Sequence, residues 1–145
     1  MADPYDLQRF VDAQDAGGAY DSAVAELRAG RKRSHWMWFV FPQIAGLGRS
    51  PTAQAYAISS LEEAQAYLAH SVLGPRLTES SRIVADLRGR TAEEVFGGID
   101  SLKLRSSMTL FHRADPENPL FGRVLDAYFG GHADPATDRL LAEAH

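Results

Sequence analysis

The stretch "SHWMWFVFPQ" (Ser34–Gln43) decides how the fold is interpreted. Trp36 to Phe41 is apolar at every position, so periodicity does not distinguish a strand from a buried helix. Its aromatic content favours a strand, but the rest of the chain offers no partner, and a lone strand is not stable. We therefore expect a buried helical turn or an extended segment that crosses the core. Pro42 ends any helix near Phe41.

Helix signals dominate the rest of the chain. Apolar residues recur with helical spacing, and glycines or capping residues separate the successive stripes. The expected N-caps are Asp6, Ser50, Ser60, Thr91, Asp100 and Asp134, with capping boxes at Ser60–Glu63 and Thr91–Glu94. The pattern predicts an all-α fold, a compact multihelical single domain of about eight helices over residues 1–145.

The amino-acid composition of the chain argues against several kinds of partner. The 145 residues have a net charge of −4 and no cysteine, which excludes disulfides and thiolate metal sites. Nucleic-acid binders are usually basic, and the only basic run is "RKR" (Arg31–Arg33). No apolar run reaches the ~20 residues of a membrane helix, and the polar N-terminus does not resemble a signal peptide. We expect a cytoplasmic protein without nucleic-acid or membrane partners.

The aromatic segment has two interpretations. As core, it buries Trp38, Phe39 and Phe41 together with Leu104, Met108 and Phe111, and Trp38→Ala should then cost about 3–5 kcal/mol. As a binding wall, it presents His35 and Trp36 at a pocket mouth, where a ring N–H meets a polar ligand. A structurally hydrogen-bonded His35 is the alternative.

The loop "GLGRSP" (Gly46–Pro51) has the parts of a small anion site. Ser50 precedes a helix whose first N–H groups point outward, and Arg49 can pair with a phosphate or carboxylate. The loop is neither a Walker loop nor a dinucleotide-binding motif. An ordinary loop followed by a capped helix is the alternative.

"DSLKLRSSMTLF" (Asp100–Phe111) places Lys103 and Ser107 on one helix face, with Ser106 beside them. A serine activated by a neutral lysine is a known nucleophile arrangement. In the alternative, Lys103 pairs with Asp100 and both serines bond back to the helix. Only two of the 15 basic residues are lysines, Lys32 and Lys103, which we interpret as a compositional bias of the genome.

These stretches, together with "DLQRFVDAQ", "EAQAYLAHSVLGPRL" and "GGHADPATDRLL", resemble a bacterial family of unknown function, the one numbered eighteen-ten. The likeness extends over nearly the whole chain and implies a mostly α-helical domain, but no reaction, cofactor or catalytic residue. The family pattern includes polar positions that match Gln14, His35, Gln43, Ser50, Tyr56, Lys103, Ser106 and Ser107. Some members carry the label calpastatin, which does not suit a non-repetitive helical chain.

The resulting hypothesis is a domain that binds a small anionic or nucleotide-like ligand, or a partner peptide, in a cleft. The predicted ligand-binding residues are His35, Trp36, Gln43, Arg49, Ser50, Lys103 and Ser107. The alternatives are an enzyme with a His/Lys/Ser site and an interaction protein without a pocket. No metal site and no cofactor are predicted, because no pair of histidines has ligand spacing, and we assign no oligomeric state.

Overall fold

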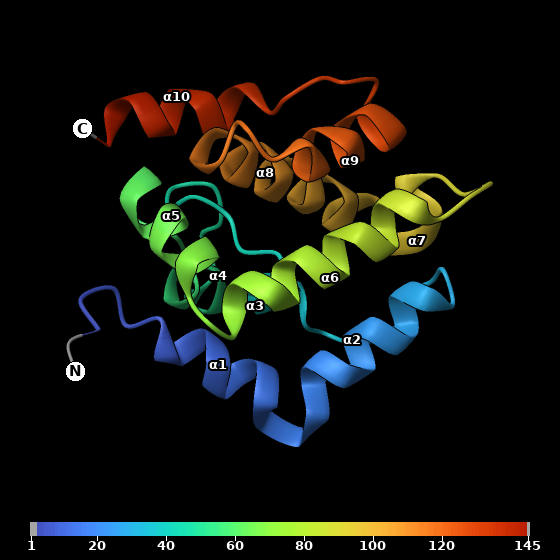
Figure 1. Cartoon of the computed structure of the whole chain (residues 1–145), viewed down its shortest axis with the longest axis horizontal. Helices are drawn as coiled ribbons and strands as arrows, with labels where there is room; N and C mark the ends of the chain where they lie inside the picture. The colour runs from blue at the N-terminus through green and yellow to red at the C-terminus, as the bar shows by residue number, and fades with distance from the viewer. Residues whose placement is uncertain (1–2, 145) are drawn as a thin grey trace.

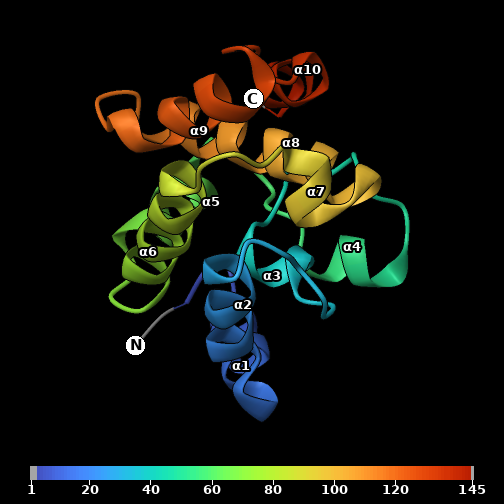
Figure 2. The same ribbon diagram turned by 90° about the vertical axis from the view of Figure 1, so that its right-hand side faces the viewer.

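The computed structural model describes residues 3–144 as helices stacked around a central aromatic segment. In chain order the elements are α1 (Gln8–Asp15), η1 (Ala16–Gly18), α2 (Ala19–Arg28), α3 (Met37–Val40), α4 (Pro51–Ala55), α5 (Leu61–Ala69), α6 (Leu73–Asp86), α7 (Ala92–Phe96), α8 (Gly98–Ala114), α9 (Pro119–Phe129) and α10 (Pro135–Glu143). In both views α8, α9 and α10 lie on one side, α1 and α2 lie on the other, and α3 sits between them (Figures 1 and 2).

The all-α prediction is confirmed. Residues 3–144 contain ten α-helices and one short 3₁₀ helix, rather than about eight helices. The difference comes mainly from α3, whose four residues give too little pattern for sequence reasoning to assign. Within the same residues, β-pairing is limited to one isolated parallel bridge between Ile44 and Ile58. None of the described helices is long and apolar enough to cross a membrane.

Side-chain caps fix most of the helix starts. Ser50, Ser60, Thr91 and Asp134 each accept a hydrogen bond from a backbone N–H in the first turn, as predicted. Thr91 forms the full capping box with Glu94. The box predicted at Ser60 is only half formed, because the Glu63 carboxylate accepts from Ser59 and Arg9 instead.

Two predicted caps are wrong. Asp6 does not cap α1; the Asp3 carboxylate accepts from the N–H groups of Leu7 and Gln8 instead. Asp100 lies inside the first turn of α8, whose N-cap is Gly97. The Asp100 carboxylate is thereby free to pair with side chains of other segments.

The opening stretch is a buried helical turn followed by an extended segment, as expected. After α3 the chain passes Pro42, and its backbone pairs with Ile58: Ile58 N donates to Gln43 O, and Ala45 N donates to Ile58 O, both at 2.8 Å. The buried side chain of Gln14 holds α3 against α1, since its Nε2 donates to Phe39 O at 2.7 Å.

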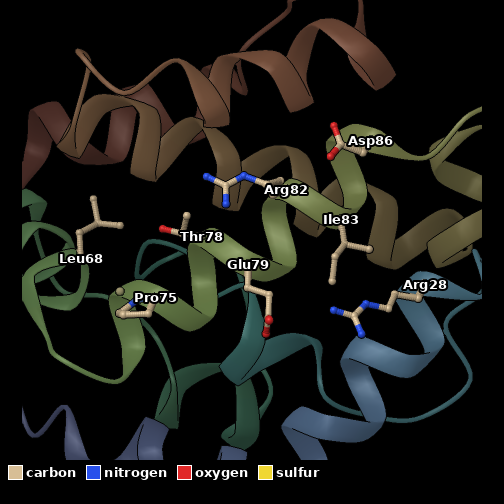
Figure 3. A pocket seen from close by; sticks show the side chains of 9 residues that line it. Arg28, Leu68, Pro75, Thr78, Glu79, Arg82, Ile83 and Asp86 are labelled. Carbon is tan, nitrogen blue, oxygen red and sulfur yellow. The ribbon is translucent and has the colours of Figure 1, made fainter.

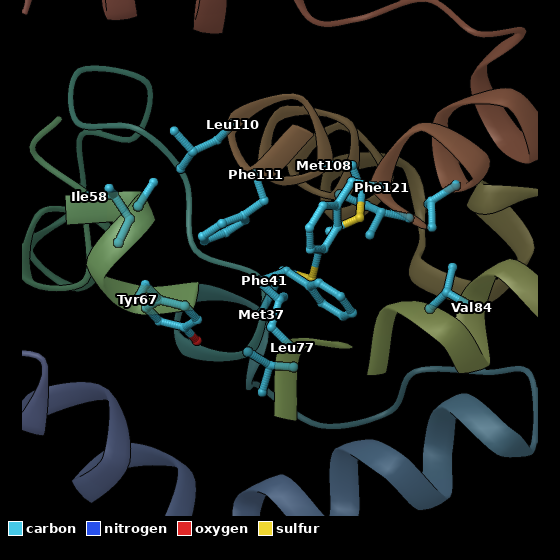
Figure 4. Packing of buried hydrophobic residues seen from close by; sticks show 14 of the residues in the cluster. Met37, Phe41, Ile58, Tyr67, Leu77, Val84, Met108, Leu110, Phe111 and Phe121 are labelled. Carbon is cyan, nitrogen blue, oxygen red and sulfur yellow. The ribbon is translucent and has the colours of Figure 1, made fainter. Parts of the chain in front are cut away.

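The core is centred on aromatic rings from this stretch. Trp36, Phe41 and Phe96 contact one another, with ring centroids 6.1–6.4 Å apart. Phe41 and Met37 belong to the same buried cluster as Met108 and Phe111 of α8 (Figure 4). The predicted core is correct for Phe41, Leu104, Met108 and Phe111 but wrong for Trp38 and Phe39, which are only partly buried. The helical turn directs Trp36 inward instead of Trp38.

Candidate functional site

Both lysines of the chain pair with the same carboxylate. Lys32 Nζ lies 2.9 Å from Asp100 Oδ2, and Lys103 Nζ lies 3.5 Å from Asp100 Oδ1. Asp100 and Lys103 belong to the first turns of α8, whereas Lys32 comes from the segment between α2 and α3. The backbone of that segment is joined to α7, since Lys32 N donates to Val95 O at 2.7 Å.

Each lysine also covers one of the two tryptophans. Lys32 Nζ lies 5.1 Å from a Trp36 ring centroid, and Lys103 Nζ lies 4.8 Å from that of Trp38, both within the range of cation–π attraction. The two lysines differ in how exposed their side chains are. The Lys32 side chain is 8% exposed, whereas that of Lys103 is 23% exposed. We call Lys32, Trp36, Trp38, Asp100 and Lys103 the lysine–tryptophan cluster.

Glu26 of α2 adjoins this cluster through its hydrogen bond with Trp36. Its carboxylate accepts from the Ser34 hydroxyl, from the backbone N–H groups of Arg33 and Ser34, and from Trp36 Nε1 at 3.0 Å. Burial raises the pKa of Glu26, but these four hydrogen bonds outweigh it and lower the pKa to about 2. Glu26 is therefore ionised at neutral pH and fixes the segment that contains Lys32.

Of the predicted residues in the aromatic stretch, none lines the four surface depressions described below. Trp36 is 1% exposed and belongs to the core. His35 is exposed and makes no hydrogen bond within residues 3–144. Gln43 is partly buried, and its backbone carbonyl pairs with Ile58. Lys103 does reach this stretch by tertiary packing, through its contact with Trp38.

The "GLGRSP" loop forms a capped turn at another place. Ser50 Oγ accepts from Ala53 N at 3.1 Å, and the Arg49 carbonyl accepts from Gln54 Nε2. The loop packs against α10, because a Cβ at Gly46 would lie 3.1 Å from the Leu140 side chain. Neither Arg49 nor Ser50 contacts Lys103 among the described interactions, so the structure does not join this loop to the cluster.

Ser107 is buried, and its hydroxyl has no hydrogen-bond partner. A Ser–Lys nucleophile needs a hydrogen bond between the two side chains, and Ser107 makes none to Lys103. Lys103 instead pairs with Asp100, as the alternative interpretation predicted. Ser106 bonds back to Leu102 O and also donates to Asp134. The helix face therefore shows no catalytic dyad.

Four surface depressions stand out, and none is lined by any of the seven predicted residues. The largest has a volume of about 670 Å³ and follows the outward face of α6, between Leu68 of α5 and Arg28 of α2 (Figure 3). Among residues 3–144, no group of three or more His, Asp or Glu side chains has an arrangement that could hold a metal ion.

Sequence reasoning missed Lys32 and Glu26 as members of the site. The pattern shows Lys32 only as part of a basic run and as one of two lysines, and it gives Glu26 no role. The usable signal was the scarcity of lysine: in a chain with 15 basic residues, the two lysines are the ones that meet. The partner carboxylate and the two tryptophans become visible only in three dimensions.

Fold and site together define a small multihelical domain with a surface cation–aromatic cluster. The chain belongs to the family described as protein of unknown function (DUF1810), which matches residues 4–141. The solved structure of the conserved hypothetical protein Rv1873 from Mycobacterium tuberculosis is similar, with 60% sequence identity and a TM-score of 0.94. The match covers 97% of this chain and 99% of that one. The comparison with curated proteins gives no match.

Proposed function

We propose that this domain binds an anionic group and that Lys103 is the residue that binds it. The observation behind this proposal is the lysine–tryptophan cluster, in which two ammonium groups share one carboxylate. Two positive charges and one negative charge leave the three groups with a net charge of +1. An incoming anion neutralises this excess.

Lys103 is the lysine that remains available to a ligand. The Lys32 side chain is only 8% exposed, and its ammonium is satisfied by Asp100, by the Ser34 carbonyl and by the face of Trp36. The Lys103 ammonium is more exposed, and its distance of 3.5 Å to Asp100 is longer than a good charge-assisted hydrogen bond. Its three donors therefore have unused capacity.

Trp38 holds the Lys103 ammonium in position. A cation over an aromatic face is attracted by roughly 0.5–1 kcal/mol at an exposed site. An unrestricted lysine side chain loses rotamer freedom when it binds a ligand, and this loss weakens the binding. Because Trp38 and Asp100 already restrict it, Lys103 is partly pre-organised for an anion.

The alternative functions receive less support from the geometry. An enzyme that uses Ser107 lacks the hydrogen bond to Lys103 that activation requires. Arg49 and Ser50 make no contact with the cluster, so they add no support to an anion site at Lys103. An anion bound at the surface through Lys103 remains compatible with all the described contacts.

The test is titration with pyrophosphate and with ADP-ribose, followed by tryptophan fluorescence and by thermal shift. A ligand that binds only the folded state raises the melting temperature. We expect a response in the wild-type chain, its retention in Lys103→Arg, and its loss in Lys103→Gln. The matched control is Arg82→Gln, which removes an exposed cation from α6. Equal responses from Lys103→Gln and the wild type would show that Lys103 is not the binding residue.

A further inference from the structure

Ile99 and Leu102 form an unusual apolar surface next to Lys103. They are 74% and 63% exposed and are the large hydrophobic residues that remain exposed within residues 3–144. Both lie in the first turns of α8, which is otherwise packed into the core. Scattered exposed apolar residues are common, but here two lie on the same turn as the proposed binding residue.

Helix geometry places the three side chains together. Leu102 lies three positions after Ile99, and Lys103 lies four positions after Ile99. Residues at these spacings are neighbours on one helix face. At about 100° per residue, Lys103 lies between Ile99 and Asp100 around the helix axis. The apolar pair thus borders the lysine–tryptophan cluster on its outer side.

A basic segment borders the cluster on the other side. The ion pair between Lys32 and Asp100 fixes this segment against α8. Lys32 and Trp36 point inward, while Arg31, Arg33 and His35 are exposed. The segment, the cluster and Glu26 together contain more cations than carboxylates. The cations are Arg31, Lys32, Arg33 and Lys103, and the carboxylates are Glu26 and Asp100. This local excess of positive charge occurs in a chain whose net charge is −4.

This surface is not one of the four depressions. Small molecules bind mainly in concave sites that bury most of their surface. Exposed apolar side chains beside charged ones, on an open surface, are instead typical of a contact with another protein. The shape therefore favours a macromolecular partner.

We infer that the anion bound by Lys103 is presented by a protein segment that combines acidic with apolar side chains. The acidic residues face Lys103 and the exposed arginines, and the apolar residues cover Ile99 and Leu102. This inference rests on the proposed function and specifies its ligand. A nucleic acid is disfavoured because its phosphate backbone presents no apolar side chains that would cover Ile99 and Leu102, and anionic vesicles are included in the test as a competing partner.

The test is selection of a random peptide library displayed on phage. The wild-type chain is used in parallel with the variant Ile99→Ser/Leu102→Ser/Lys103→Gln, and a melting curve of each establishes folding. We expect the wild type to enrich peptides that carry Asp or Glu beside Leu, Ile or Phe. Their affinity should fall by about tenfold or more in the variant, as when interface anchors are removed. The single substitution Leu102→Ser repeats the comparison should the triple variant unfold.

Three outcomes would overturn the inference: equal recovery on both chains, enrichment of basic peptides, or binding of anionic vesicles or single-stranded DNA in place of peptides. The pyrophosphate titration separates the two proposals. If pyrophosphate binds through Lys103 while no acidic–apolar peptide is enriched, the partner is wrong and the anion site stands. If both fail, neither proposal stands.

Discussion

Lys32 and Lys103 bind opposite oxygens of the Asp100 carboxylate, Lys32 at 2.9 Å and Lys103 at 3.5 Å. The shared carboxylate joins the segment before α3 to α8. The two pairs are not equivalent, because the Lys32 side chain is less exposed than that of Lys103, 8% against 23%. We expect the first pair to stabilise the fold and the second to serve binding.

The substitution Asp100→Asn tests this division. It leaves the Lys32 side chain, which is only 8% exposed, without a negative partner, and the loss of a charge-assisted hydrogen bond at such a position costs about 1.5–3 kcal/mol. Lys103→Gln removes only a partly exposed pair and should cost less than about 1 kcal/mol. Urea denaturation followed by circular dichroism measures both. Equal costs for the two substitutions would contradict the assignment of different roles to the two lysines.

The two tryptophans should differ in the same way. Trp36 is buried among Phe41 and Phe96, so Trp36→Ala should lower the free energy of unfolding by about 3–5 kcal/mol. The sequence-based expectation assigned this cost to Trp38. Since Trp38 is only partly buried, Trp38→Ala should cost clearly less.

Fluorescence quenching provides an independent measurement. In the wild type, acrylamide should quench a Trp38 component and leave a protected Trp36 component. Trp38→Phe should remove the accessible component and keep the protected one. Loss of the protected component instead would mean that the burial of the two rings is reversed.

The sequence predicted the fold well because helix signals are local. Caps such as Ser50, Thr91 and Asp134 act on residues within one turn, so their patterns are visible without tertiary contacts. The orientation of Trp36 and Trp38 is not local. In a run that is apolar throughout, both rings suit the core, and tertiary contacts such as the packing of Trp36 against Phe96 of α7 and its hydrogen bond to Glu26 select Trp36.

The candidate site was predictable in part. The segment from His35 to Trp38 and the helix with Lys103 were both singled out, and they do meet. Lys32 and Glu26 were missed because the tertiary partners of a lysine in a basic run and of a glutamate on a helix have no sequence signature. The hypothesis grouped Arg49 and Ser50 with Lys103 as ligand-binding residues, whereas the loop that contains them packs against α10.

Glu26 predicts the behaviour of the protein in acid. Its pKa is about 2 in the folded protein, against 4.5 for an ordinary glutamate. A group with a lowered folded-state pKa stabilises the protein above the unfolded value, and this stabilisation is lost as the pH falls. The contribution of Glu26 is thus complete above pH 4.5 and declines towards pH 2.

Glu26→Gln should therefore reduce stability at neutral pH and flatten the decline in stability between these two pH values. Urea denaturation at a series of pH values measures both effects. Asp21→Asn, which changes an exposed carboxylate on the same helix, is the control. An unchanged pH profile in Glu26→Gln would mean that its carboxylate does not hold the segment before α3.

Ser107 provides a test of the enzyme alternative. Its buried hydroxyl makes no hydrogen bond, and a buried polar group without a partner costs about 1–3 kcal/mol in lost solvation. Ser107→Ala should therefore leave stability unchanged or raise it by about 1 kcal/mol, since it removes that cost at the expense of a small cavity. Ser106→Ala, which removes a hydroxyl bonded to Asp134, should destabilise the protein by a similar amount.

Chemical labelling completes this test. A serine-reactive fluorophosphonate attacks nucleophilic hydroxyls that a neighbouring base activates. We expect mass spectrometry to find no adduct at Ser107, because its hydroxyl is buried and has no contact with Lys103. An adduct that disappears in Ser107→Ala and in Lys103→Gln would instead establish a Ser–Lys nucleophile and require a rearrangement of this helix face.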